Sequence, residues 1–165
     1  MPRDTLGILA KRIGARLKKK RLKLATAESC TGGWIAQAVT SVPGSSGWFD
    51  RGFVTYSNAA KRELLGVRAR TLSRFGAVSP EAAREMAAGA LARSRAQVSI
   101  AVTGVAGPTG GTRTKPVGMV CIAWSRQKGT LESVTRRFLG GRERVRRQSV
   151  IAALQGLLER LEKTE

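Results

Sequence analysis

The fold of this chain is decided by Leu24-Ala25-Thr26-Ala27-Glu28-Ser29-Cys30-Thr31-Gly32-Gly33, where an apolar strand breaks and a helix is expected to follow. The first amides of a helix lack partners and carry partial positive charge, so they can hold an oxyanion or a phosphate beside Ser29. Gly32 and Gly33 allow a close approach of the backbone. The simpler interpretation, favoured by this segment alone, is that Ser29 or Thr31 caps the helix and the glycines form a tight turn.

Composition predicts one domain over residues 1–165, because 165 residues with 42% hydrophobic content can bury a single sizeable core. Thirty Lys and Arg against 11 Asp and Glu give a net charge of +19, which favours anionic ligands, nucleic acid or an acidic partner. The densest basic run covers residues 18–21, with Lys23 close behind. We interpret it as a solvated helix end rather than as a nucleic-acid contact, although nucleic-acid binding through charge stays open.

The residue inventory narrows the chemistry. The chain has no histidine, so Ser-His-Asp and Cys-His triads and His-ligated zinc are excluded. Its two cysteines, Cys30 and Cys121, form no CxxC pair, so the sequence predicts no metal site and fits a reducing compartment. No apolar run approaches the ~20 residues of a membrane span, and we predict a cytoplasmic protein without a membrane contact.

Helical and strand patterns alternate along the chain. Helices are predicted at about 4–21, 31–41, 57–65, 80–94 and 142–161, and strands at about 23–27, 52–56, 98–103, 118–125 and 131–138. We therefore predict an α/β protein, a three-layer α/β/α sandwich on a mixed, mostly parallel sheet whose last two strands form a hairpin.

Three predicted strands end in polar or glycine-rich segments: the Ser29 turn, residues 55–58 with Lys61, and the loop 103–112. Ligands of open α/β sheets bind at the carboxyl ends of strands, so we expect these segments to share one pocket. Lys61 is expected in the first turn of its helix, where the dipole and the cationic chain favour a neutral amine. A neutral lysine beside a serine can act as general base, and Tyr56 could relay a proton or donate to an oxyanion.

Each of these features also has a structural interpretation. Lys61 taken alone is interpreted as an exposed helix residue, and Tyr56 as a residue that packs at the end of a strand. The loop from Gly104 to Thr112 is neither a Walker A loop nor a GxGxxG fingerprint. It could form an anion nest or serve as a purely structural crossover.

Taken in order, several blocks resemble the C-terminal domain of the competence-damage-inducible CinA proteins, which also occurs as a stand-alone nicotinamide-nucleotide amidase. The blocks span nearly the whole chain: Thr26-Ala27-Glu28-Ser29-Cys30-Thr31-Gly32-Gly33, Val42-Pro43-Gly44-Ser45-Ser46, Val54-Thr55-Tyr56-Ser57-Asn58 with Lys61, Leu64-Leu65-Gly66-Val67, Gly76-Ala77-Val78-Ser79, Ala101-Val102-Thr103-Gly104-Val105-Ala106-Gly107-Pro108 and Lys115-Pro116-Val117-Gly118. An ordered set of this length is far more specific than any single glycine motif.

The resemblance implies hydrolysis of nicotinamide mononucleotide to nicotinate mononucleotide and ammonia in pyridine-nucleotide salvage, without a metal or other cofactor. It implies Ser29 as nucleophile with Lys61 and Tyr56 as its activating partners, and a homodimer. The ligand-lining positions that it implies are Cys30, Thr31, Gly32, Gly33, Thr103, Gly104, Gly107, Gly110, Gly111 and Arg142. The alternative is a domain that binds pyridine nucleotides or nucleic acid without turnover. We also expect Trp34, Trp48 and Phe49 to form an association surface.

Overall fold

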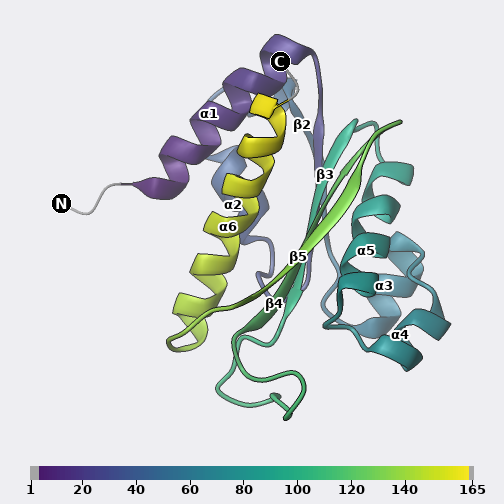
Figure 1. The fold of residues 1–165 in the computed structure, drawn as a ribbon. Helices are drawn as coiled ribbons and strands as arrows, with labels where there is room; N and C mark the ends of the chain where they lie inside the picture. The colour runs from purple at the N-terminus through teal and green to yellow at the C-terminus, as the bar shows by residue number, and fades with distance from the viewer. Residues whose placement is uncertain (1–3, 164–165) are drawn as a thin grey trace.

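A computed structural model describes residues 4–163 of the chain, and within them the predicted alternation of helices and strands is present (Figure 1). The strands are β1 (Leu24–Glu28), β2 (Phe49–Val54), β3 (Val98–Gly104), β4 (Met119–Arg126) and β5 (Leu131–Arg137). The helices are α1 (Thr5–Lys20), α2 (Trp34–Thr40), α3 (Asn58–Leu65), α4 (Ala69–Phe75), α5 (Pro80–Ala92) and α6 (Arg142–Lys163), with a 3₁₀ turn, η1 (Ser45–Gly47).

The strands of this described part form one sheet in the order β2-β1-β3-β4-β5. Strand β1 pairs in parallel with both β2 and β3, whereas β4 is antiparallel to β3 and to β5. The sheet is therefore mixed, and β4 alone among its strands runs against the others. Helices α1, α2 and α6 cover one face and α3, α4 and α5 the other, which makes the predicted three layers (Figure 1).

Side chains alternate between the two faces along each central strand, as the pleat requires. In β3, Val98, Ile100 and Val102 pack under α1, α2 and α6, while Ala101 packs under α5. The core on the first face is built from large aliphatic and tryptophan side chains. The core on the second face is mostly alanine, so α5 lies close to the sheet, and the Ser99 hydroxyl donates 2.7 Å to the Ala87 carbonyl of that helix.

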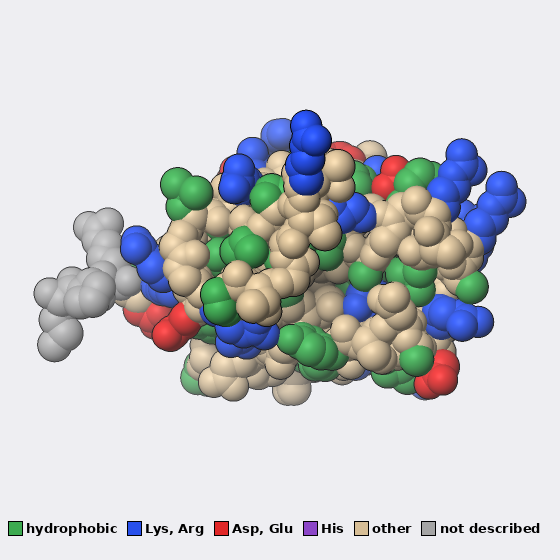
Figure 2. All heavy atoms as spheres, turned by 90° about the horizontal axis from the view of Figure 1, so that it is seen from below, with side chains coloured by type: hydrophobic (Ala, Val, Ile, Leu, Met, Phe, Trp, Pro, Cys, Tyr) green, Lys and Arg blue, Asp and Glu red, His purple; other side chains and the backbone are tan. Residues whose placement is uncertain are grey.

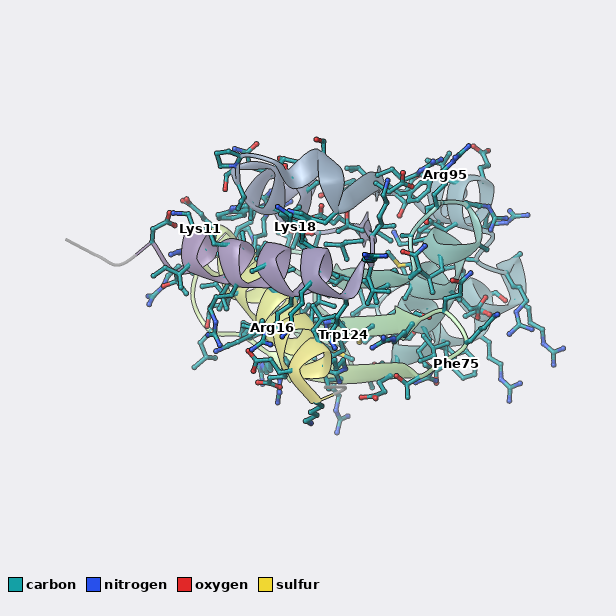
Figure 3. All side chains as sticks on the ribbon, turned by 90° about the horizontal axis from the view of Figure 1, so that it is seen from above. Lys11, Arg16, Lys18, Phe75, Arg95 and Trp124 are labelled. Atoms are coloured by element: carbon teal, nitrogen blue, oxygen red, sulfur yellow. The ribbon has the colours of Figure 1, made fainter. Side chains whose placement is uncertain are left out.

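Local signals fixed several helix ends correctly. Ser57 caps α3 by accepting from the Ala60 amide at 3.0 Å, and Gly66 ends that helix at a φ of 69°. Ser79 caps α5 with Pro80 in its first turn. The basic run lies at the exposed C-terminal end of α1, as predicted; Figure 3 looks down on this end of the molecule and labels Lys18 there.

Three details differ from the sequence prediction. Helix α2 begins at Trp34 rather than at residue 31, because Gly32 and Gly33 adopt positive φ angles of 61° and 102° that a helix does not allow. Strand β2 lies at residues 49–54, so Tyr56 follows the strand instead of ending it. Helix α4 was not predicted, because its seven residues carry four polar or charged side chains and too few turns to show a periodic apolar stripe.

The expected association surface is also wrong in part. Trp48 is only 4% exposed and belongs to the core, while Trp34 and Phe49 are partly buried against it. An aromatic residue next to a turn can face inward as readily as outward, and sequence position alone does not distinguish these cases. Within residues 4–163, none of the helices is long and apolar enough to cross a membrane.

Candidate functional site

A cavity of about 290 Å³ lies at the carboxyl ends of β1, β2 and β3. Its walls come from the three segments that the sequence analysis singled out: the Ser29 turn, the segment after β2 with α3, and the loop after β3. Figure 2 views the molecule from this end, where Lys and Arg side chains outnumber acidic ones. The prediction that three polar strand ends meet in one pocket is confirmed.

Ser29 follows β1 directly and is held by the sheet. Its amide donates 2.9 Å to the Val102 carbonyl of β3, which extends the parallel ladder by one residue. Its side chain is 8% exposed and lines the cavity. The last residues of a central strand thus place a hydroxyl at the base of the pocket.

Lys61 points from the first turn of α3 to this serine, with its amine 2.9 Å from Ser29 Oγ. The amine also donates to the carbonyls of Thr55 at 2.8 Å and Tyr56 at 3.3 Å. The residue is 1% exposed, and burial lowers the pKa of the Lys61 amine from its ordinary value of 10.5. The structural interpretation of Lys61 as an exposed helix residue is therefore wrong.

Cys30 is the other potential nucleophile beside the cavity. Burial raises the pKa of its thiol to about 11, with a smaller opposing effect from its own backbone amide. A thiol with that pKa is protonated at neutral pH and is a poor nucleophile. The geometry therefore favours Ser29, which also has a basic group within hydrogen-bond distance.

The amides of Ile35 and Ala36 in the first turn of α2 are not available to an anion beside Ser29, contrary to expectation. Glu28, which is 1% exposed, fills that position instead: its carboxylate accepts from the amides of Ile35 at 2.7 Å and Ala36 at 3.2 Å. The helix amides are therefore occupied by a carboxylate of the protein. In the turn that follows Ser29, the amides of Cys30, Thr31 and Gly33 make none of the backbone hydrogen bonds found within residues 4–163.

Arg142 and Tyr56 both line the cavity and contact each other. The Arg142 guanidinium donates to the Gly107 carbonyl at 2.7 Å and to the Tyr56 hydroxyl at 3.0 Å. The Tyr56 side chain is 62% exposed, and the hydrogen bond recorded for its phenol is with Arg142, while its backbone carbonyl contacts Lys61. The first residue of α6 thus joins the glycine-rich loop to the segment after β2.

Most of the residues predicted for the site line the cavity: Ser29, Cys30, Tyr56, Lys61, Thr103, Gly104, Gly107, Gly110 and Arg142. Thr31, Gly32, Gly33 and Gly111 lie beside it rather than in its wall. The Thr103 hydroxyl donates 2.9 Å to the Ala77 carbonyl, and Lys115, at the end of the loop, donates to the Phe75 carbonyl. Lys115 therefore fixes the loop to α4.

Sequence reasoning missed Glu28, Asn58 and Arg146. Asn58 lines the cavity, and the other two hold the Ser29 turn. Glu28 gave a usable signal, since it is a charged residue directly after four apolar or small strand residues. Arg146 gave none, because it is one of many arginines and meets the turn only through the tertiary fold. No group of three His, Cys, Asp or Glu within residues 4–163 could hold a metal ion.

The protein is of the open-sheet α/β class, with a contacting serine and lysine in a cavity at the carboxyl ends of its strands. The family model described as the CinA C-terminal domain matches residues 7–161, and the chain belongs to that family. The chain is 50% identical over 151 residues to the nicotinamide-nucleotide amidohydrolase PncC of Escherichia coli (strain K12), covering 90% of each chain. It is 52% identical over 156 residues to the protein of the same name from Pseudomonas putida, covering 94% of this chain and 97% of that one.

Solved structures agree with this assignment. The crystal structure of competence/damage inducible protein CihA from Agrobacterium tumefaciens has a TM-score of 0.94 and 47% identity, and 98% of each chain is covered. A CinA superfamily protein from Escherichia coli has a TM-score of 0.90 and 40% identity, covering 96% of this chain and 93% of that one. The α/β fold class inferred from the sequence is therefore confirmed.

Proposed function

We propose that this protein hydrolyses the carboxamide of nicotinamide mononucleotide, giving nicotinate mononucleotide and ammonia, with Ser29 as nucleophile and Lys61 as general base. The observation that carries the mechanism is the buried contact of 2.9 Å between the Lys61 amine and Ser29 Oγ. The names of the relatives from Escherichia coli and Pseudomonas putida support the substrate.

The surroundings of Lys61 determine which way a proton would move. Carbonyl oxygens only accept, so the contacts to Thr55 and Tyr56 each require an N–H of the amine. As an ammonium, the amine donates to all three oxygens, Ser29 Oγ included. Once it has lost a proton, two N–H bonds remain for the two carbonyls, and the lone pair is left to face Ser29. The backbone thus orients the lysine as an acceptor of the serine proton, which is the geometry of a general base.

The reaction then follows in two halves. Ser29 Oγ loses its proton to Lys61 and attacks the carboxamide carbon, which forms a tetrahedral oxyanion. The C–N bond breaks, and the leaving nitrogen takes the proton from the Lys61 ammonium and departs as ammonia. Water then gives a proton to Lys61 and attacks the remaining ester. The bond between the acyl carbon and Ser29 Oγ breaks, nicotinate mononucleotide is released, and Ser29 Oγ takes the proton back from the Lys61 ammonium.

Other side chains of the cavity would bind and orient the substrate. The amides of Cys30 and Thr31 are our candidates for the oxyanion donors. Arg142 and the loop from Gly104 to Gly111 would hold the phosphate through charge and backbone amides. Tyr56 stays our candidate for a proton relay, and its contact with Arg142 supports a second role in orienting this guanidinium.

The test is ammonia release from nicotinamide mononucleotide by the purified chain, compared with release by Ser29→Ala and by Ser73→Ala. Ser73 is an exposed residue of α4 and serves as the control. We expect turnover by the wild type and by Ser73→Ala, and loss of at least about 10³-fold in kcat for Ser29→Ala. A folded wild type that binds the nucleotide without releasing ammonia would instead support the non-catalytic binding domain.

The resemblance also leads us to propose a homodimer acting in the cytoplasm within pyridine-nucleotide salvage. Light scattering on the purified chain checks the oligomeric state, with a mass twice 17.7 kDa expected. A monomer with full activity would show that the cavity is complete in one copy.

A further inference from the structure

Two charged side chains, which come from different elements, form hydrogen bonds with the turn that follows Ser29. Glu28 ends β1, and its Oε1 accepts from the Thr31 hydroxyl at 2.7 Å as well as from α2. Arg146 comes from the second turn of α6, and its guanidinium donates to the carbonyls of Cys30 at 3.0 Å and Thr31 at 3.2 Å. The Arg146 guanidinium also lies 5.5 Å from the Trp34 ring, which restricts its orientation.

These contacts occupy the carbonyls of the turn. The Ser29 carbonyl accepts from the Gly32 amide at 3.1 Å, and the Thr31 carbonyl accepts from the Trp34 amide at 3.1 Å in addition to Arg146. The Cys30 carbonyl has Arg146 as its donor. The amides of Cys30 and Thr31, in contrast, donate none of the backbone hydrogen bonds found within residues 4–163, although the Cys30 amide interacts with its own thiol.

The geometry of a trans peptide connects these two facts. In each peptide unit the C=O and the following N–H point in opposite directions. Fixing the Cys30 carbonyl on Arg146 therefore directs the Thr31 N–H away from Arg146. Fixing the Thr31 carbonyl on Arg146 directs the Gly32 N–H to the Ser29 carbonyl, and this bond in turn directs the Cys30 N–H away from Gly32. Donors that stabilise an oxyanion act through such preorganisation, because they need not reorient during the reaction.

We propose that Arg146 and Glu28 are positioning residues for the amidase reaction: together they hold the peptide planes after Ser29 so that the Cys30 and Thr31 amides are set to bind the oxyanion. This inference rests on the proposed function. Neither side chain lines the cavity or touches the reacting atoms, so each acts through the turn. Arg146 acts on the carbonyls, and Glu28 acts on the Thr31 hydroxyl and on the start of α2.

The first test compares Arg146→Met with Arg146→Lys and with Arg160→Met. Arg160 is a matched control because it lies on the same helix, over the Trp124 ring, and donates 2.9 Å to a backbone carbonyl, that of Gly156. We expect Arg146→Met to lower kcat by roughly 10- to 100-fold with KM within about twofold, somewhat less than removal of a whole oxyanion donor. Arg146→Lys should recover part of kcat, and Arg160→Met should retain it.

The second test uses the aldehyde analogue of nicotinamide mononucleotide, which forms a tetrahedral adduct with a nucleophilic serine. Its Ki should rise in Arg146→Met by the same factor by which kcat/KM falls, because both report on oxyanion stabilisation. Inhibition by the product, nicotinate mononucleotide, should not change. A purely structural defect would raise the Ki of the aldehyde and that of the product together.

The third test separates positioning from stability. Glu85 is a matched carboxylate elsewhere in the fold: it accepts from the Arg68 amide at 3.0 Å and from the Thr71 hydroxyl at the start of α4. Glu28→Gln and Glu85→Gln should both lower Tm, since each variant weakens the hydrogen bonds that a carboxylate accepts at the start of a neighbouring helix. Only Glu28→Gln should lower kcat, by roughly tenfold.

The outcomes are distinct. A wild type that releases no ammonia overturns the proposed function, and this inference with it. An active wild type whose Arg146→Met and Glu28→Gln variants keep kcat overturns the inference alone. Equal losses of kcat in Glu28→Gln and Glu85→Gln would likewise assign Glu28 to stability rather than to positioning.

Discussion

The two faces of the sheet are built from side chains of different size. Among the described residues, the core under α1, α2 and α6 has 23 buried members, of which three are alanine. The core under α3, α4 and α5 has 14, of which nine are alanine. Large side chains hold helices away from a sheet and small ones let them approach, so the second face brings the backbone of its helices close to the strands.

On the second face, the close packing extends to α3, the helix that carries Lys61. Helix α3 packs on α5 so closely that a Cβ at Gly89 would lie 1.9 Å from the Leu65 carbonyl. Lys61, on α3, can then reach the end of β1 while remaining buried. The face with large side chains contributes the long helix α6, whose Arg142 and Arg146 contact the glycine-rich loop and the Ser29 turn.

The largest effect should come from removing Lys61, which lies on α3 on the alanine-rich side of the sheet, here called the alanine face. Lys61→Ala deletes the proposed base, and we expect kcat to fall at least about 10³-fold with a much smaller change in KM. Arg62→Ala, the exposed neighbour on the same helix, is the control and should retain kcat. Steady-state kinetics of ammonia release decides this, and an unchanged kcat in Lys61→Ala would remove the lysine from the mechanism.

A second prediction compares one close contact on each face. Gly89→Ala places its Cβ against the Leu65 backbone, whereas Gly156→Ala on α6 places its Cβ 2.1 Å from the Trp124 ring. A side chain can shift more easily than a helix backbone, so we expect Gly89→Ala to cost about 3 kcal/mol and Gly156→Ala about 1 kcal/mol. Denaturant unfolding measures both, and the reverse order would show that the alanine face is the more adaptable one.

A third prediction concerns pH. The proposed base must be neutral, and burial lowers its pKa from 10.5. The rate kcat/KM should therefore rise tenfold per unit as pH increases toward the pKa of Lys61, and level off above it, with the midpoint below 10.5. If Gly89→Ala remains folded, it should admit water near α3, raise this pKa and move the midpoint to higher pH. An identical midpoint in the wild type and in Gly89→Ala would show that the packing of α3 on α5 does not lower the pKa of Lys61.

The smallest effect is expected within the alanine face itself. Ser99→Ala removes the buried hydrogen bond from β3 to the Ala87 carbonyl and should lower the free energy of unfolding by about 1 kcal/mol. Because neither Ser99 nor Ala87 lines the cavity, kcat should stay unchanged. Thermal unfolding and turnover, measured on the same preparation, check both statements.

Local sequence was enough for much of the site. The capping signals of Ser57 and Ser79 placed α3 and α5, and the first of these also placed Lys61 in the first turn of its helix. The ends of three strands could be located from apolar runs followed by glycine or polar residues. Their meeting in one pocket follows from a general property of α/β sheets.

The sequence by itself determined the fold class and the order of the elements other than α4, because these depend on residue pattern and on short-range backbone chemistry. Its ordered blocks of family resemblance identified Ser29 and Lys61 as a pair. Only the tertiary structure decided that Glu28 rather than an external anion fills the start of α2, that Trp48 faces inward, and that Arg146 reaches the Ser29 turn from more than 100 residues away. Such contacts depend on the distances between packed layers. Those distances are set by the combined sizes of many buried side chains, and no local segment encodes them.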